Sequence, residues 1–168
     1  MTDDVKGLNW LLDPADPGVR YLALRDLVRL TANDADLAAA RAEAHTRGPI
    51  ARVLDGMHPE GWWAKPGPGY SPKYRSTVWA LILLGQLGAS AAQDERVATG
   101  CRYLLDASFN PGGQLSSSSQ TAPGSAIDCL QGNLLRALLD LGCDDPRLDI
   151  AFEWMARSVT GEGMAPKE

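Results

Sequence analysis

Two groups of side chains in this sequence have the chemistry of a binding or catalytic site. The first group gathers aromatic, basic and hydroxyl side chains, and it consists of Trp62, Trp63, Tyr70, Lys73, Tyr74, Ser76, Thr77 and Trp79. Aromatic faces hold apolar chains and stabilise cations. From this group we predict six ligand-binding residues, which are Trp63, Tyr70, Lys73, Tyr74, Thr77 and Trp79.

The second group, Asp128, Cys129, Gln131 and Asn133, combines a carboxylate, a thiol and two amides. A carboxylate beside a thiol can act as a general acid and a nucleophile, so Asp128 is a catalytic candidate and Gln131 a ligand-binding candidate. A structural interpretation of Asp128 stays open, because Ser125 and Asp128 have the spacing of a capping box. Adjacent helical residues also diverge by about 100°, so Asp128 and Cys129 do not face one target.

The composition argues against several other classes of site. The formal net charge is −5 and no stripe of Lys and Arg is present, which disfavours nucleic-acid binding. The two histidines, His45 and His58, lie far upstream of Cys101 and Cys129 without metal-ligand spacing, so we predict no metal site and no cofactor. The longest apolar run, residues 78–84, is far shorter than the roughly 20 residues of a membrane span.

The first residues and the cysteines favour a cytoplasmic protein. Residues 1–4 are Met-Thr-Asp-Asp, without the basic and then apolar order of a signal peptide. The three cysteines are odd in number and show no CxxC spacing, which is typical of free thiols in a reducing compartment. With 168 residues, 45% of them hydrophobic, the chain is long enough for a single domain, 1–168, with its own core.

Capping signals predict an all-α chain. Asp16, Ser71 and Asp145 each precede a proline, which is tolerated in the first turn of a helix. Gly88 and Gly142 each follow a leucine-rich run, where a left-handed residue ends a helix. No segment shows sustained period-two alternation, so strands are not expected. The helices are predicted at about 17–31, 34–46, 48–57, 73–88, 94–107, 125–142 and 146–158, with a short one near 7–13.

The apolar patterns predict two layers of helices. Two helices carry apolar residues on one stripe only, as helices packed on one side do. These stripes are Val97, Cys101, Leu104 and Leu105 in residues 94–107, and Leu148, Phe152, Met155 and Val159 in residues 148–159. The segment 79–84 is apolar nearly all round, as expected of an inner helix that is covered on both sides.

The chain also repeats itself with a period of about 50 residues. Residues 86–88 (Gln-Leu-Gly) return as residues 140–142 (Asp-Leu-Gly), 54 positions later. Residues 94–97 (Asp-Glu-Arg-Val) return as residues 145–148 (Asp-Pro-Arg-Leu), 51 positions later. Each copy is predicted to be an inner helix, a short turn, an outer helix and a glycine-bearing loop. Such a period is typical of stacked units that bury a continuous core together.

Residues 51–63, Ala-Arg-Val-Leu-Asp-Gly-Met-His-Pro-Glu-Gly-Trp-Trp, resemble the glutamine–tryptophan motif of the triterpene cyclases and of the prenyltransferase/squalene-oxidase repeat. Residues 70–79 resemble the start of the following inner helix in bacterial relatives, and through the repeat the resemblance covers nearly the whole chain. It implies paired helices in an (α/α) toroid-like arrangement, here a partial ring of about seven or eight helices. The chain would then be a fragment of a longer one, or an incomplete ring.

The resemblance implies a squalene–hopene-cyclase-like protein that binds an apolar, isoprenoid-like molecule where the inner-helix N-termini converge. In that family Trp62 and Trp63 would instead fasten their loop to the preceding helix, so both roles stay open. Met57 stands where the motif has glutamine, and the sequence contains neither the Asp-x-Asp-Asp acid motif nor an Asp/Cys/His zinc site. Whether the protein is an enzyme, as a terpene-cyclase-like isomerase or lyase or a transferase would be, is therefore left open.

A helical-repeat scaffold that binds another protein is the alternative. Residues 16–24 resemble the opening of a HEAT-type repeat, although such arrays have a period of roughly 40–47 residues. A scaffold should present a shallow, extended groove, whereas a toroid should present a deep aromatic cavity. A homo-oligomer or a ring-completing partner would cover any inner-helix face left exposed.

Overall fold

The computed structural model of the protein describes residues 3–118 and 127–162. Within these residues the backbone is helical, and no strand is present apart from an isolated bridge between Phe109 and Leu115. None of the described helices has the length and apolarity to cross a membrane. The all-α class is confirmed. The elements are α1 (Asp3–Leu11), α2 (Pro17–Leu22), the π-helical segment η1 (Ala23–Val28), α3 (Ala35–Thr46), α4 (Pro49–Asp55), α5 (Thr77–Leu87), α6 (Glu95–Ser108), α7 (Asp128–Asp140) and α8 (Arg147–Thr160).

Several helix ends coincide with the predicted capping residues. The Asp16 side chain accepts a backbone N–H of α2 at 3.2 Å, and the Asp145 side chain accepts one of α8 at 2.9 Å. Gly88 and Gly142 follow α5 and α7 with φ angles of 79° and 75°, the left-handed conformation that glycine adopts without steric cost. Local capping chemistry therefore sets these boundaries.

The helix predicted at 73–88 begins later, at Thr77. Ser71 and Pro72 lie in the preceding loop and are joined by a cis peptide bond. Ser76 is the capping residue, and its hydroxyl donates to the carbonyls of Gly69 and Pro72 at 2.6 and 2.9 Å. These bonds hold the loop against the start of α5, so the serine–proline pair marks a turn instead of a helix start.

Three further boundaries differ from the prediction, and the first is that of the short helix expected near 7–13, which is α1 (Asp3–Leu11). The predicted helix at 17–31 is α2 followed by η1, and it ends at Val28 because Arg29 has a φ of 60°. The helix predicted at 125–142 begins at Asp128. Ser125, the predicted capping-box partner of Asp128, lies outside the described residues.

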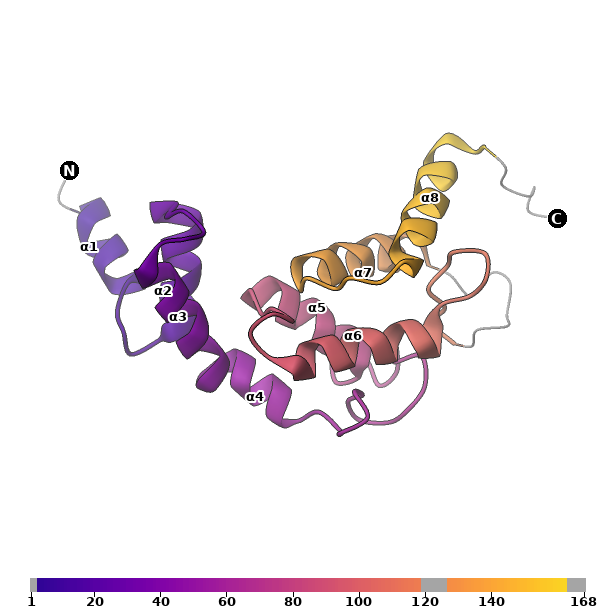
Figure 1. Ribbon diagram of the computed structural model, residues 1–168, viewed down its shortest axis with the longest axis horizontal. Helices are drawn as coiled ribbons and strands as arrows, with labels where there is room; N and C mark the ends of the chain where they lie inside the picture. Colours follow the sequence, from indigo (N-terminus) through magenta and orange to yellow (C-terminus); the bar gives the residue numbers. More distant parts are fainter. Residues whose placement is uncertain (1–2, 119–126, 163–168) are drawn as a thin grey trace.

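Three helix pairs follow one another along the chain, namely α2–η1 with α3, α5 with α6, and α7 with α8 (Figure 1). Helix α4 continues from α3 and packs on α5. Helices α5 and α7 lie directly against each other, since a Cβ added to Gly85 would lie 3.4 Å from that of Ala137. They form an inner layer, while α6 and α8 form the outer layer. The prediction that residues 79–84 are covered on both sides is wrong, because Leu83 is 43% exposed and Ile82 is half-buried. Helices α1 and α8 lie at opposite ends of the molecule (Figure 1).

Leucines of the inner and outer helices fill the core. Those with 1% exposure or less include Leu81, Leu84, Leu104, Leu105, Leu134, Leu135, Leu138 and Leu141. The apolar stripe predicted for α6 is confirmed, because all four of its residues are buried. The stripe predicted for α8 is only partly buried, because Phe152 and Val159 are 36% and 82% exposed.

Side-chain contacts repeat together with the helices. In each copy an arginine in the first turn of the outer helix binds two carboxylates. One lies two residues before the arginine, and the other lies near the end of an earlier helix, α4 for the first copy and α6 for the second. These pairs, which we call the arginine clamps, are Arg96 with Asp94 (2.8 Å) and Asp55 (3.0 Å), and Arg147 with Asp145 (2.7 Å) and Asp106 (2.7 Å). Gly61 and Gly113, both with positive φ, also correspond, since a Cβ at either would meet the outer-helix backbone at 2.7 or 2.8 Å. The predicted repeat is therefore present in the contacts.

Candidate functional site

Two of the predicted ligand-binding residues, Trp63 and Thr77, are buried in the core, with 5% and 0% of their surface exposed. The Trp63 indole N–H donates to the carbonyl of Val53 in α4 at 2.7 Å. The backbone N–H of Trp63 donates to the hydroxyl oxygen of Thr77 in α5 at 3.1 Å. These bonds tie the loop after α4 to both helices, which is the fastening role that the sequence left open for Trp63.

The other four predicted residues around the start of α5 meet at the surface. The rings of Tyr70 and Tyr74 lie 5.5 and 5.0 Å from that of Trp79, and the Trp79 indole N–H donates to the Tyr70 carbonyl at 2.9 Å. The Lys73 ammonium lies 5.1 Å from the ring centre of Tyr74 and 5.7 Å from that of Trp79. Tyr74 is 73% exposed. This aromatic cluster, as we call the four residues, offers ring faces and a cation to a ligand from solvent.

The second predicted group does not converge on one site. Gln131 is fully buried, where its amide accepts the Leu115 N–H at 2.7 Å and donates to the Gly113 carbonyl at 3.0 Å. It therefore fastens the loop after α6, much as Thr77 fastens the loop after α4. Asp128 is exposed in the first turn of α7, where a carboxylate interacts favourably with the helix dipole.

An uncovered surface, which we call the inner groove, runs between α5 and α7. Its residues recur every three or four positions, so each set lies on one face of its helix. They are Trp79, Ile82, Leu83 and Gln86 of α5, none of them buried, and Asn133, Arg136 and Asp140 of α7, all exposed. A hollow of about 60 Å³ lies between the two sets. Through Trp79 the inner groove begins at the aromatic cluster.

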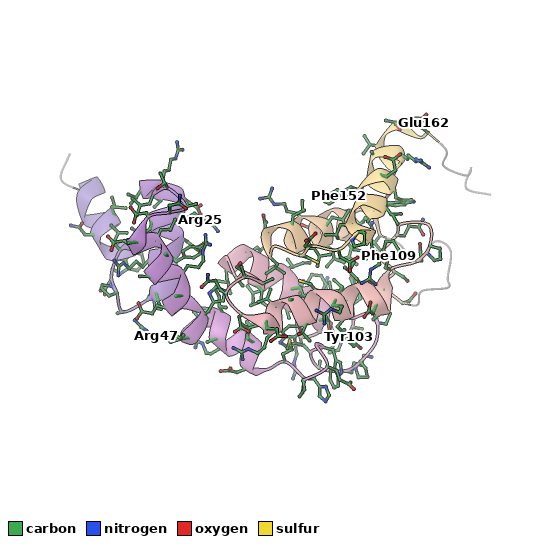
Figure 2. All side chains as sticks on the ribbon, viewed as in Figure 1. Arg25, Arg47, Tyr103, Phe109, Phe152 and Glu162 are labelled. Carbon is green, nitrogen blue, oxygen red and sulfur yellow. The ribbon has the colours of Figure 1, made fainter. Side chains whose placement is uncertain are left out.

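At its other end the inner groove opens into a polar cleft of about 550 Å³ between the first helix pair and the inner helices. Figure 2 shows Arg25 on the side of the first pair that faces α5 and α7. We call this hollow the arginine cleft. It is lined by Tyr21, Arg25, Asp26, Arg41, Gly85, Gln86, Gly88, Ala89, Ser90, Arg136 and Asp140.

Tyr21 organises two of the guanidinium groups in the arginine cleft. Those of Arg25 and Arg41 lie 5.5 and 5.4 Å from the centre of its ring, and Arg41 also donates to its hydroxyl at 3.2 Å. Arg25 binds Asp26 through two hydrogen bonds of 2.6 and 2.8 Å. The hydrogen bond from Arg25 lowers the pKa of Asp26, so this pair is charged at neutral pH.

The remaining charges leave one arginine available. Arg136 is paired with Asp140 at 2.8 Å. In the part of the chain that the structure describes, Arg41 has no carboxylate partner. The arginine cleft therefore presents a guanidinium that is held in place by Tyr21 and not neutralised.

Sequence reasoning missed the arginine cleft because its arginines come from three separate helices. Arg25 belongs to η1, Arg41 to α3 and Arg136 to α7, with no common spacing. An available signal was the position of Arg136 on α7, whose other residues are largely apolar.

No protein-family model, no curated protein and no solved structure matches this chain.

Proposed function

We propose that this chain is a binding module of the α/α-repeat class, with its helix pairs arranged as in part of a toroid, and that it recognises a segment of another protein along the inner groove. One observation carries the proposal. The surface left uncovered along α5 and α7 joins the aromatic cluster at one end to the arginine cleft at the other. An open groove of this kind is expected of a scaffold that binds protein, whereas a toroid that binds a small molecule is expected to have a deep aromatic cavity.

The two ends of the inner groove define the chemistry of the ligand. The aromatic cluster would take an apolar or aromatic side chain, and Arg41 would take a carboxylate, for which guanidinium is a strong donor. From Trp79 to Gln86 the axis of α5 rises about 10 Å, which equals roughly three residues of extended chain. An extended acidic segment with an aromatic residue at one end therefore fits the surface.

The test uses a fluorescent seven-residue peptide with tryptophan near one end and two glutamates near the other. Saturable binding in fluorescence anisotropy, with a Kd of about 100 µM or tighter, is expected. Tyr74→Ala and Arg41→Ala should each weaken binding by about fivefold or more, since each removes an interaction worth about 1 kcal/mol. Replacing the two glutamates of the peptide by lysines should abolish saturable binding.

Two substitutions outside the groove serve as matched controls. Trp10 is 75% exposed, close to the 73% of Tyr74, and lies on α1. Arg52 is an exposed arginine on α4. Trp10→Ala and Arg52→Ala should leave binding unchanged. Equal weakening by the controls, or no saturable binding up to about 1 mM, would refute the proposal.

A second candidate is binding of an apolar, isoprenoid-like molecule, as the resemblance to terpene cyclases and prenyltransferases implies. The aromatic cluster favours it, because three rings meet there and one of them is largely exposed. Titration with farnesol, followed by tryptophan fluorescence, tests this candidate. Binding that is lost in Tyr74→Ala but unchanged in Arg41→Ala would support the small molecule, whereas a peptide needs both residues.

A further inference from the structure

Two of the three cysteines meet where the last two helix pairs join. Cys101 lies in α6 with 1% of its surface exposed, and Cys143 lies half-buried in the turn between α7 and α8. The Cys101 thiol donates a hydrogen bond to the sulfur of Cys143, which packs against the core that contains Cys101. Both thiols are free in this structure, so the two sulfurs form a reduced pair.

The repeat shows that the backbone holds Cys143 at this place. Its N–H donates to the carbonyl five residues before it at 2.9 Å, as does the N–H of Ala89, 54 positions earlier. Ala89 is 1% exposed, and so is Ile50, which precedes Cys101 by 51 positions. Where the earlier copy buries two hydrocarbon side chains, the later copy therefore places two thiols.

Cys143 can be reached from solvent, whereas Cys101 cannot. A hollow of about 210 Å³ is lined by Cys143 and by Ala98 and Arg102, which lie three residues before Cys101 and one residue after it on α6. A water molecule occupies about 30 Å³ of the liquid, so the hollow has room for a molecule as small as hydrogen peroxide. One sulfur of the pair thus faces a small reactant, while the other lies behind it.

The surroundings of the two sulfurs also differ. The hydrogen bond from Cys101 lowers the pKa of Cys143 below its ordinary value of 9.0; the Arg147 guanidinium acts in the same direction, while burial and the carboxylates of Asp144 and Asp145 oppose it. The same hydrogen bond and burial raise the pKa of Cys101. Because the thiolate is the reactive form of cysteine, Cys143 is the more reactive sulfur of the pair.

We propose that Cys101 and Cys143 are an oxidative modification site, at which a peroxide converts the two thiols into an intrachain disulfide, with Cys143 oxidised first. The thiolate of Cys143 attacks one peroxide oxygen, the O–O bond breaks, and hydroxide leaves while Cys143 becomes a sulfenic acid. The sulfur of Cys101 then attacks that of Cys143, the S–O bond breaks, and the oxygen leaves as water with the Cys101 proton. The two thiols lose two electrons, and the peroxide is reduced to water.

The disulfide would fasten the last helix pair to the middle one. It would join α6 covalently to the turn before α8, at the junction where Arg147 already binds Asp106 of α6 at 2.7 Å. Neither cysteine belongs to the inner groove, the aromatic cluster or the arginine cleft, so the site does not depend on the proposed function.

The experiment uses the full chain with Cys129→Ser, which removes the exposed third thiol, and hydrogen peroxide at about 100 µM. After the peroxide is quenched and the chain unfolded, the titratable thiols should have fallen from two to none, and dithiothreitol should restore both. Peptide mapping without reduction should show Cys101 joined to Cys143. Two remaining thiols, a loss that dithiothreitol does not reverse, or a disulfide between two chains would overturn the proposal.

Two further substitutions in this background test the order of oxidation. In Cys101→Ser, whose hydroxyl can donate the same hydrogen bond, Cys143 should remain a sulfenic acid that dimedone traps. In Cys143→Ser, the buried Cys101 should keep its thiol. Dimedone trapping at Cys101, or its absence at Cys143, would overturn the order. If either variant fails to fold, as circular dichroism would show, the thiol titration still decides whether the disulfide forms, because it leaves both sulfurs in place.

Discussion

Replacement of Thr77 by valine tests whether its hydroxyl serves the fold. Thr77 is fully buried, and its hydroxyl oxygen is the acceptor for the backbone N–H of Trp63 at 3.1 Å. Valine has nearly the same shape but no acceptor, so this N–H would lie unpaired in the core. An unpaired buried donor costs about 1–3 kcal/mol, and we expect the free energy of unfolding to fall by about 2 kcal/mol.

The measurement is urea unfolding followed by circular dichroism. In a separate thermal melt, the same loss of about 2 kcal/mol should lower the melting temperature by roughly 4–8 °C for a domain of this size. Thr77→Ser is the control, because serine keeps the hydroxyl and loses one methyl group, worth about 1 kcal/mol. Thr77→Val must therefore be the less stable variant. If it were as stable as Thr77→Ser, the hydroxyl would not be structural, and the reasoning would be refuted.

Three further predictions concern other buried or paired groups. Gln131→Met should cost about 2–4 kcal/mol in urea unfolding, because two buried backbone groups lose their partner; a loss below 1 kcal/mol would contradict this. Arg147→Met should cost about 1 kcal/mol at pH 7. The hydrogen bond from Arg147 lowers the pKa of Asp145 below its ordinary value of 3.8, so the ion pair stabilises the fold only while Asp145 is ionised. The cost of Arg147→Met should therefore vanish as the pH falls below the lowered pKa, and a cost retained at pH 2 would refute this prediction. Iodoacetamide should label exposed Cys129 in the native protein, and buried Cys101 only after unfolding, as peptide mass mapping would show.

The helix boundaries that the sequence predicts are those fixed by local chemistry. Asp16 and Asp145 cap their helices with their own side chains, as their position before a proline indicates. The same signal fails at Ser71, because the chain there is held by bonds from Ser76 to the preceding loop. Tyr74 in this loop has a φ of 63°, which no local pattern announces.

The candidate site was predictable only where its residues are close in sequence. Tyr70, Tyr74 and Trp79 were predicted together and lie together. Which polar side chains are free for a ligand depends on tertiary contacts, so the structural use of the Gln131 amide by a distant loop could not be foreseen. Arg41 was overlooked because its hydroxyl partner, Tyr21, lies 20 positions away on another helix.

The arginine clamps have a consequence for how such a chain can change in length. Arg147 binds its two carboxylates in the same way as Arg96 does, 51 positions earlier. The first turns of α6 and α8 therefore make equivalent ion pairs and could replace each other. Removing residues 95–145 would join Asp94 to Pro146 and place Arg147 opposite Asp94 and Asp55. A chain of this kind would therefore keep its arginine clamps when it grows or shrinks by whole units.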